Sequence, residues 1–400
     1  MTRPLRIVSV CRNFPTPDDP SGGVFVLNRV AAMANKADVR ALHAIPHCPV
    51  VRPLPAWAQR DIRSEAGLRI ENAPMFYLPG ILKSLDSGWL ARAVGKKIER
   101  LHREQPIDII DAHFGYPEGV GCEAIARRLN IPLFITIRGF ENEFADRPVI
   151  GSRMIGAMSR ATGIVSVSHS LRQFAIERGI SGDKIRVIHN AIDDSLFSYG
   201  DSVTARQVLG LQQGRPLVVS VGHLIPRKRH NVLLQAFSTV RKHLPDSQLV
   251  IIGSTAADPA CTRLLRDQVS RLNLESHVRF LGNIPPSEVV NWLRAADLFA
   301  LATAREGCCN AILEALAVGL PVISTMAGDN VSFVRPGVNG FLAAIDDVAA
   351  LQQAIVESLS RRDWRRADIA EKLHAQVGDW SVVADRVIEY FESSLRVSAQ

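Results

Sequence analysis

The chain has 400 residues, of which 47% are hydrophobic and 22% are charged, and its formal net charge at pH 7 is +7. This is the balance of a folded protein, and at ~150 residues per domain the length predicts two or three domains. No apolar run approaches the ~18 residues of a membrane-spanning helix. The six cysteines are scattered without a CxxC pair. That pattern argues against a disulfide framework or a structural zinc site and favours a cytoplasmic location.

The positive charge is concentrated in one half of the chain. Residues 1–200 carry 26 Lys and Arg against 20 Asp and Glu, a net of +6, whereas residues 201–400 carry 21 against 20. A basic first half indicates an anionic partner, either a phosphate-bearing acceptor or the inner face of the cell membrane, bound peripherally. Nucleic acid is not expected as a partner, because the sequence has no zinc finger, RNP-like aromatic pattern or Lys/Arg run.

Short apolar segments rich in branched residues alternate with segments of helical length. In the first half the expected strands are Arg6–Val10, Ile107–Ala112, Leu133–Ile137, Gly163–Val167 and Arg186–Ile188. In the second half they are Leu217–Val221, Leu249–Ile252, Arg279–Leu281, Asp297–Ala302, Val322–Ser324 and Gly340–Leu342. Continuous apolar strands separated by helices predict parallel sheets covered on both faces. The expected fold class is therefore α/β, with a doubly wound, Rossmann-like domain present twice.

A polar, glycine-containing stretch at 196–215 indicates the seam between the domains. We expect an N-terminal, acceptor-side domain at 1–200 and a C-terminal domain at 201–378. An amphipathic C-terminal helix at 379–400 would pack back on the first domain. Because ligands of open parallel sheets lie beyond the carboxyl ends of the strands, two such domains facing each other would form one interdomain cleft.

The densest group of candidate functional residues follows the expected strand Asp297–Ala302. Asn310 indicates that a helix begins near Cys309, which places Glu306 in the preceding loop and Glu314 about one turn inside the helix. The amides at such a helix start suit a diphosphate, and the carboxylate of Glu314 can accept two hydrogen bonds from a vicinal diol such as a ribose. The alternative is an ordinary capped helix whose glutamates only complement the helix dipole.

This block, EGCCNAILEALAVGLPVIST, resembles the donor-binding signature of the family 4 retaining glycosyltransferases, which have the GT-B fold. Other segments in the same order are also similar to that family: SGGVFVLNRV, DIIDAHFGYPEGVG, TIRGFENE, IRVIHNAIDDSLF and VGHLIPRKRHNVLLQAF. The amino half is most similar to members that build bacterial surface polysaccharides. The resemblance implies transfer of a hexosyl-type group from a nucleotide-diphosphate sugar to an acceptor hydroxyl with retention. The acceptor would be a glycan or a lipid-linked molecule in polysaccharide or glycolipid biosynthesis.

The resemblance also implies roles for individual residues. Glu314 would hold the ribose hydroxyls, Glu306 would lie by the donor sugar, and Lys228 would neutralise the diphosphate. The donor would also be held by the amides of Cys308, Cys309 and Asn310, and by Gly22 and Gly23 of the first domain, which let amides approach the phosphates. His113 and Arg138 would lie near the sugar and the acceptor.

Three departures from the family pattern keep other functions open. His223 stands where the family has an arginine, with Arg227 the candidate to replace that cation, Arg138 stands where histidine is common, and Ser332 falls in a loop that usually reads Gly-Gly…Glu. His223 and Ser332 leave a degenerate donor-binding assembly protein as an alternative, and a GT-B epimerase or hydrolase is a further alternative.

No metal or other cofactor is expected. The sequence has no DxD motif or carboxylate cluster for a metal beside the diphosphate, and Lys228 with the helix amides could serve instead. His43 and His47 are not expected to form a metal pair, because Pro46 between them disfavours a helix.

The basic stretch 89–103 has two interpretations. Leu90, Val94, Ile98 and Leu101 form one helical face, with Arg92, Lys96, Arg100 and Arg103 largely elsewhere. An ordinary helix covering a parallel sheet has this pattern, and so does a helix lying on a membrane surface. We favour the covering helix.

Overall fold

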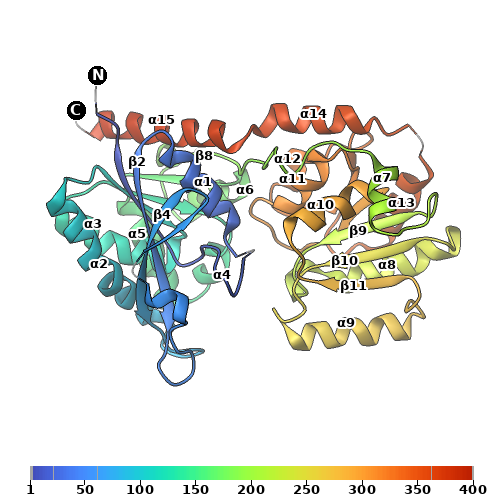
Figure 1. Cartoon of the computed structure of the whole chain (residues 1–400), viewed down its shortest axis with the longest axis horizontal. Coiled ribbons are helices and arrows are strands. Elements are labelled where there is room, and N and C mark those ends of the chain that lie inside the picture. The colour runs from blue at the N-terminus through green and yellow to red at the C-terminus, as the bar shows by residue number, and fades with distance from the viewer. Residues whose placement is uncertain (1–2, 21, 61, 362, 399–400) are drawn as a thin grey trace. The chain divides into compact units, whose positions relative to one another are not determined.

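The computed structural model describes residues 3–20, 22–60, 62–361 and 363–398. Ser21, which begins one of the family-like segments quoted above, lies outside the described residues. The chain divides into two compact units (Figure 1): unit 1 is Met1–Asn190 with Trp380–Gln400, and unit 2 is Ala191–Asp379. The division falls ahead of the seam expected at 200/201. The residues just after it, Ile192 and Phe197, are buried in the core of unit 2.

Unit 1 is built on an eight-stranded sheet in the order β3-β4-β2-β1-β5-β6-β7-β8. The strands are β1 (Arg6–Cys11), β2 (Asp38–His47), β3 (Ile62–Glu65), β4 (Leu68–Phe76), β5 (Ile109–His113), β6 (Leu133–Ile137), β7 (Gly163–Ser166) and β8 (Ile185–Val187). All neighbours pair in parallel except β3 and β4. The strands expected in this half are present, and β2, β3 and β4 were not predicted.

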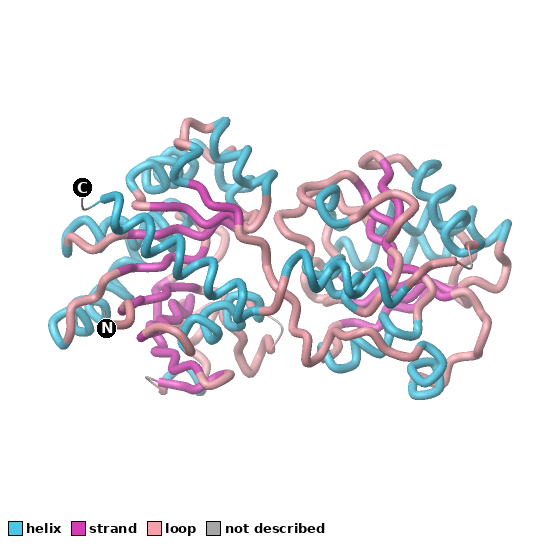
Figure 2. Tube along the Cα trace, turned by 90° about the horizontal axis from the view of Figure 1, so that it is seen from above, coloured by secondary structure: helices cyan, strands magenta, loops and turns pink. Residues whose placement is uncertain are grey.

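The helices of unit 1 connect these strands, except α15, which follows unit 2 in the chain (Figure 2). They are α1 (Val24–Ala34), α2 (Asp86–Glu104), α3 (Val120–Leu129), α4 (Glu141–Ala145), α5 (Pro148–Arg160), α6 (His169–Glu177) and α15 (Trp380–Ser398), with short turns η1 (Ala56–Gln59), η2 (Lys83–Leu85), η3 (Gly115–Gly119) and η4 (Gly182–Lys184).

Helix α2 decides between the two interpretations of the basic stretch. Leu90, Val94 and Ile98 have no exposed surface and Leu101 is 4% exposed, so the apolar face lies in the core. The covering-helix interpretation is confirmed, and the membrane-surface helix is wrong because no apolar face remains to enter a bilayer. Arg100 is in addition paired with Glu71 and Glu104, at 2.7 and 2.9 Å.

Helix α15 ends the chain as part of unit 1. Val383, Val387 and Phe391 are buried, and the Phe391 ring packs against Phe134 of β6 with centroids 4.3 Å apart. The Tyr390 hydroxyl donates to the Lys184 carbonyl at 2.6 Å and accepts from the Ile164 amide at 3.2 Å. Hydrophobic burial and these two hydrogen bonds thus tie the end of the chain to β7 and β8.

Unit 2 has a six-stranded, fully parallel sheet in the order β11-β10-β9-β12-β13-β14. The strands are β9 (Leu217–Val221), β10 (Gln248–Ile252), β11 (Val278–Gly282), β12 (Leu298–Leu301), β13 (Val322–Thr325) and β14 (Gly340–Ala343). The helices are α7 (Ser202–Val208), α8 (His230–His243), α9 (Pro259–Arg271), α10 (Pro286–Ala295), α11 (Asn310–Ala317), α12 (Asn330–Phe333), α13 (Val348–Ser360) and α14 (Arg366–Val377), with the turn η5 (Pro226–Lys228). Each strand agrees with a predicted one.

The apolar strands of unit 2 form because both of their faces are buried. Val219 contributes to one hydrophobic core and the preceding Val218 to the other, on the opposite side of the sheet. Asp258 and Asp347 start the covering helices α9 and α13 by accepting hydrogen bonds from the third residue on, at 2.9 Å. The α/β class with two parallel-sheet domains is thereby confirmed. Of the described helices, none combines the length and the apolar character that crossing a membrane requires.

Candidate active site

In unit 1 the predicted His113 ends β5 and is completely buried. Its Nε2 lies 3.1 Å from Oδ2 of Asp111, which is itself held by Nη2 of Arg29 at 2.8 and 2.9 Å. Burial lowers the pKa of His113 to about 4, in spite of the neighbouring carboxylate, whereas Arg29 holds the pKa of Asp111 well below its usual range. At neutral pH His113 is therefore a neutral imidazole, and its Nδ1 has no hydrogen-bond partner among the described residues.

Arg138 follows β6, the neighbour of β5 in the sheet. Its Nη1 donates to Oδ1 of Asn190 at 2.9 Å, and its guanidinium lies 5.0 Å from the centre of the Phe25 ring. Its buried Nε and Nη2 have no partner among the described residues. Burial, and secondarily Arg29, lower its pKa to about 9. Arg138 thus presents two unpartnered donors and a positive charge at the carboxyl edge of the sheet, where an anion would be stabilised.

Gly22 and Gly23 lie between β1 and α1. Gly23 has φ +66°, and a Cβ atom there would stand 1.7 Å from the carbonyl oxygen of Asn13, so only glycine fits. The Gly22 amide donates to Oδ1 of Asp19 at 3.0 Å. A phosphate approaching that amide would therefore have to displace Asp19.

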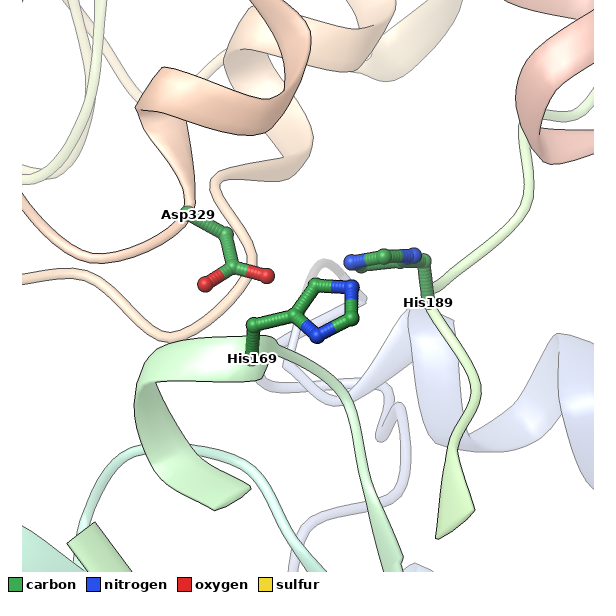
Figure 3. A group of neighbouring side chains, drawn as sticks. All are labelled: His169, His189 and Asp329. Atoms are coloured by element: carbon green, nitrogen blue, oxygen red, sulfur yellow. The ribbon is translucent and has the colours of Figure 1, made fainter. Parts of the chain in front are cut away.

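Two histidines that the sequence analysis did not single out lie at the same edge of this sheet. Figure 3 shows His169 at the start of α6 and His189 on the segment after β8, with ring centroids 5.5 Å apart. They follow the carboxyl ends of β7 and β8, just as His113 ends β5 and Arg138 follows β6. The carboxyl edge of unit 1 is therefore rich in hydrogen-bonding groups that could meet a polar ligand.

In unit 2 the expected loop and helix follow β12. Cys309 is the N-cap position and α11 begins at Asn310, as the capping pattern predicted. Glu306 accordingly lies in the loop and Glu314 in the helix. The side chain of Cys309 makes no capping hydrogen bond. The buried Cys309 thiol has its pKa raised to about 12 by burial and by the Glu306 charge, so it stays protonated and is not a reactive thiolate.

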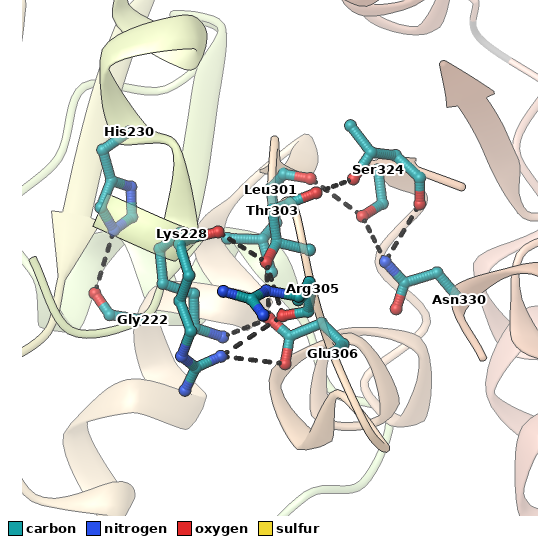
Figure 4. Close-up of polar contacts among 11 residues, drawn as sticks. Gly222, Lys228, His230, Leu301, Thr303, Arg305, Glu306, Ser324 and Asn330 are labelled. Carbon is teal, nitrogen blue, oxygen red and sulfur yellow. Dashed lines mark hydrogen bonds and ion pairs between the residues drawn. The ribbon is translucent and has the colours of Figure 1, made fainter. Parts of the chain in front are cut away.

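Lys228 and Glu306 form a buried ion pair at the centre of this site (Figure 4). Nζ of Lys228 lies 2.7 Å from Oε1 of Glu306, and the two side chains are only 11% and 7% exposed. The same oxygen accepts a hydrogen bond from Oγ1 of Thr303 at 2.8 Å. Nη1 of Arg227 lies 3.6 Å from Oε2, with the Arg227 side chain 33% exposed. Arg227 thus stands beside the pair, where it was expected to replace the missing arginine.

The pKa values keep this pair charged. Burial alone would raise the pKa of Glu306, but the charges of Lys228 and Arg227 outweigh it and hold the pKa below its ordinary value. Burial would lower the pKa of Lys228, but the Glu306 carboxylate raises it above its ordinary value. Both groups are therefore ionised at neutral pH, and a cation is fixed beside the start of α11.

Glu314 has a different environment. Its side chain is half-buried, and the structure records no hydrogen bond to its carboxylate from the described residues. Burial raises its pKa to about 7, although the Lys228 charge opposes this. A carboxylate that titrates near neutrality and lacks a donor is ready to accept hydrogen bonds from a ligand.

Close backbone approach fixes this geometry at two glycines. At Gly328, with φ +55°, a Cβ atom would stand 2.2 Å from the carbonyl oxygen of Glu306. At Gly222, a Cβ atom would stand 3.2 Å from the side-chain carbons of Lys228. Gly328 lies in the loop that departs from the family pattern, and it still allows that loop to pass against the Glu306 backbone.

The other departure in unit 2 has a structural role. His223 follows β9, is exposed, and accepts a hydrogen bond from the Ser254 amide through Nδ1 at 3.2 Å. The Leu224 amide in turn donates to the Ser254 carbonyl at 3.1 Å. His223 therefore joins the loops that follow the adjacent strands β9 and β10.

The fold and this pair of sites define a glycosyltransferase of GT-B architecture, as comparisons with known proteins show. Residues 17–196 match the model of Glycosyltransferase Family 4, and residues 201–374 match that of Glycosyl transferases group 1. Together the two models account for most of the chain. The chain belongs to the family 4 glycosyltransferases.

Similar proteins agree with this assignment. The chain is 28% identical, over 93% of its length and 94% of the relative's, to a Bacillus subtilis glycosyltransferase assigned to teichuronic acid biosynthesis. It is 23% identical, over 76% of each chain, to N-acetyl-alpha-D-glucosaminyl L-malate synthase of Bacillus anthracis. The structure of Anabaena HepE in complex with UDP-glucose matches 97% of this chain and 99% of its own, with a TM-score of 0.75 and 21% identity. The comparisons do not favour the epimerase, hydrolase or degenerate alternatives.

Several residues that shape the sites were not predicted from the sequence. Thr303 is completely buried and donates a hydrogen bond to Glu306, and Asp111, which is paired with Arg29, lies 3.1 Å from His113. Thr303 could have been found, because it is the first polar residue after the apolar strand β12. The contact of Arg29 with Asp111 joins residues 82 positions apart, which no local pattern indicates.

Proposed function

We propose that this glycosyltransferase moves a hexosyl-type group from a nucleotide-diphosphate sugar to an acceptor hydroxyl with retention and without a metal. The observation that carries the proposal is the buried Lys228–Glu306 pair beside the start of α11. Retention follows from the resemblance to a retaining family. The donor class is also supported by the similar Anabaena structure, which is a complex with UDP-glucose.

The diphosphate would be stabilised by the cations of unit 2. Its departure from the sugar creates negative charge, and fixed cations and amides aimed at that charge lower the barrier. An ammonium has three donors, and the described residues accept one hydrogen bond from Lys228. The guanidinium of Arg227 and the amides of Cys308, Cys309 and Asn310 supply further donors. These groups supply the electrostatic stabilisation that a metal provides in other transferases.

Glu306 and Glu314 would hold the two ends of the donor. The Glu314 carboxylate accepts no hydrogen bond from the described residues, so the hydroxyls of a ribose would satisfy it. Glu306 is fixed by Lys228 and Thr303, and its second oxygen, Oε2, has only the Arg227 ion pair at 3.6 Å among the described residues. That oxygen is the group proposed to accept from a sugar hydroxyl.

Unit 1 would bind the acceptor through His113 and Arg138. The neutral imidazole offers Nδ1, and the unpartnered donors of Arg138 favour an anionic group. An anionic acceptor also agrees with the net +6 of residues 1–200 and with the malate in the name of one relative. A glycan or lipid-linked acceptor in polysaccharide or glycolipid biosynthesis is proposed, in keeping with the teichuronic acid relative.

A panel of UDP- and GDP-sugars tests the proposal. Calorimetric binding would select the donor, and transfer or slow hydrolysis of the bound donor would follow, with the anomer of the product read by NMR. Lys228→Met should abolish donor turnover, whereas Arg263→Gln on the exposed face of α9 should leave it unchanged. Absence of binding to every nucleotide sugar, or turnover by Lys228→Met at the wild-type rate, would overturn the assignment. An inverted product would overturn retention alone.

A further inference from the structure

Exposed apolar side chains gather on two neighbouring loops of unit 1. Val50 is 90% exposed, Val51 69%, Ile81 60% and Leu82 55%. Scattered single hydrophobic residues are ordinary on a protein surface, but a contiguous group marks an interaction site. Of the ten large hydrophobic residues exposed in the described part of unit 1, seven lie between residues 50 and 85.

The two loops emerge side by side because their strands are neighbours. β2 pairs with β4 in parallel, with His47 opposite Phe76, so the chain leaves both strands at the same edge (Figure 1). The first loop is closed by two hydrogen bonds between the backbones of Cys48 and Arg52, at 2.7 and 2.8 Å, which leave Val50 and Val51 at its tip. The tip is therefore held outward by backbone bonds.

The second loop is equally well defined. Nζ of Lys83 donates to the Leu78 carbonyl at 2.8 Å and lies 3.5 Å from the centre of the Tyr77 ring. These contacts fold residues 77–83 into a compact turn with Ile81 and Leu82 on its outside. Beside the turn, a pocket of about 460 Å³ is lined by His47, Pro74, Phe76, Trp89, Arg92 and Ala93. The rings of Phe76 and Trp89 meet there edge to face, with their centroids 4.9 Å apart.

The segments that flank these loops are mainly basic. Residues 47–60 and 76–98 contain six basic residues, Arg52, Arg60, Lys83, Arg92, Lys96 and Lys97, and a single acidic residue, Asp86. Asp86 is 3% exposed, so its carboxylate is not presented at the surface. Lys97 is paired with Glu71 at 3.8 Å, which leaves the other five basic side chains to meet an anionic surface. Apolar tips, flanking aromatic rings and a basic rim are what a protein needs to rest at the interface of an anionic bilayer.

We propose that the loops 48–53 and 77–85 dock unit 1 on an anionic lipid membrane. Val50, Val51, Ile81 and Leu82 enter the interface, and Arg92 and Lys96 on α2 contact the lipid headgroups. This role falls to loop tips because the apolar face of α2 is buried. The surface lies at the same carboxyl edge of the sheet as His113 and Arg138, but none of its residues is assigned a role with the donor or the acceptor, so a failure of either proposal leaves the other standing.

Sedimentation of the full chain with vesicles tests this surface. The vesicles would be phosphatidylcholine alone or with about a third phosphatidylglycerol. Binding should require the anionic lipid and weaken with added salt. Val51→Asp with Leu82→Asp, and separately Arg92→Gln with Lys96→Gln, should each weaken binding by on the order of tenfold or more.

Matched controls lie on α9 of unit 2. Leu264 is 65% exposed, so Leu264→Asp makes the same change of side chain away from the loops, and Arg263→Gln with Arg266→Gln matches the charge variant. These controls should bind as the wild type does, and all variants should keep wild-type turnover of a water-soluble acceptor. Equal binding to neutral and anionic vesicles, no binding to either, or equal losses in the controls would overturn the proposal. So would a dimer of the wild-type chain that Val51→Asp with Leu82→Asp dissociates, because the surface would then be covered by a second copy.

Discussion

The ammonium of Lys228 lies 2.7 Å from the carboxylate of Glu306, although 78 positions separate the two residues in the chain. The pair joins the turn after β9 to the loop after β12. These two strands are neighbours in one parallel sheet. Its burial makes it both a structural and a functional element, because removing one partner leaves the other as an uncompensated charge.

We expect Lys228→Met to lower the free energy of unfolding by about 3 kcal/mol, because Glu306 is left buried with only Thr303 and Arg227. The double variant Lys228→Met with Glu306→Gln should recover much of that loss, because no buried charge is then unpaired. Neither variant should regain turnover. Urea denaturation of the four proteins in this double-mutant cycle measures the coupling. A loss of stability in the double variant equal to the sum of the two single losses would mean zero coupling, and the pair would then contribute nothing to the fold.

Glu314→Gln should stabilise the protein at pH 8 while it weakens donor binding. The folded-state pKa of Glu314, about 7, is above its ordinary value of 4.5, so the folded state binds the proton more tightly than the unfolded state. This group therefore makes stability fall as pH rises from 4.5 to 7, and the penalty is complete above pH 7. Removing the Glu314 carboxylate should raise the free energy of unfolding by on the order of 2–3 kcal/mol at pH 8 and by almost nothing at pH 4.

The same variant should weaken binding of the nucleotide by on the order of 1–3 kcal/mol, because a charge-assisted bond to the ribose is lost. Thermal denaturation at both pH values and calorimetry at pH 8 measure the two effects on one preparation. Unchanged nucleotide affinity in the folded variant would remove the ribose role from Glu314.

Donor affinity should itself depend on pH through this residue. If the ribose hydroxyls donate to an ionised Glu314, the bound state favours loss of its proton, so affinity is full above pH 7. Below pH 7 the donor affinity should fall by up to about tenfold per pH unit. A nucleotide sugar is the suitable probe, because its diphosphate carries no terminal phosphate to titrate. Glu314→Gln supplies the control, and its binding curve should be flat over this range. A wild-type curve that is equally flat would contradict the prediction.

Much of this arrangement could be predicted from local sequence. The strands of unit 2 are uninterrupted apolar runs because helices cover both faces, and Asn310 after Cys309 placed Glu306 in a loop and Glu314 in a helix. The strands β2 and β4 escaped prediction because they carry polar residues that find partners only in the fold. His43 in β2 contacts the Arg12 carbonyl, and Glu71 in β4 pairs with Arg100 of α2. Such pairings are fixed by tertiary structure, so no periodicity reveals them.

Catalysis is expected to continue when divalent metals are removed. Lys228 and Arg227 already place two cations beside the start of α11, so the diphosphate has compensating charge without an added ion. Initial rates should be essentially unchanged by excess EDTA, measured with the donor that the panel selects. Loss of activity that magnesium or manganese restores would contradict this expectation and assign a metal to the reaction.

Gly328→Ala should damage the site more than an alanine at another glycine of the same backbone type. Both Gly328 and Gly337 have positive φ, +55° and +75°, where a side chain costs about 1–2 kcal/mol. At Gly337 nothing lies within 4 Å of an added Cβ, whereas at Gly328 the carbonyl oxygen of Glu306 would be 2.2 Å away. Gly337→Ala should therefore show only the backbone cost, with donor affinity unchanged. Gly328→Ala should be less stable still and should bind the donor more weakly, because the Glu306 loop must move and carries its carboxylate away from Lys228.

Unfolding in urea and calorimetry with the nucleotide sugar compare the two variants. Equal effects in both would mean that the loop tolerates the added methyl group and that contact with Gly328 does not position Glu306.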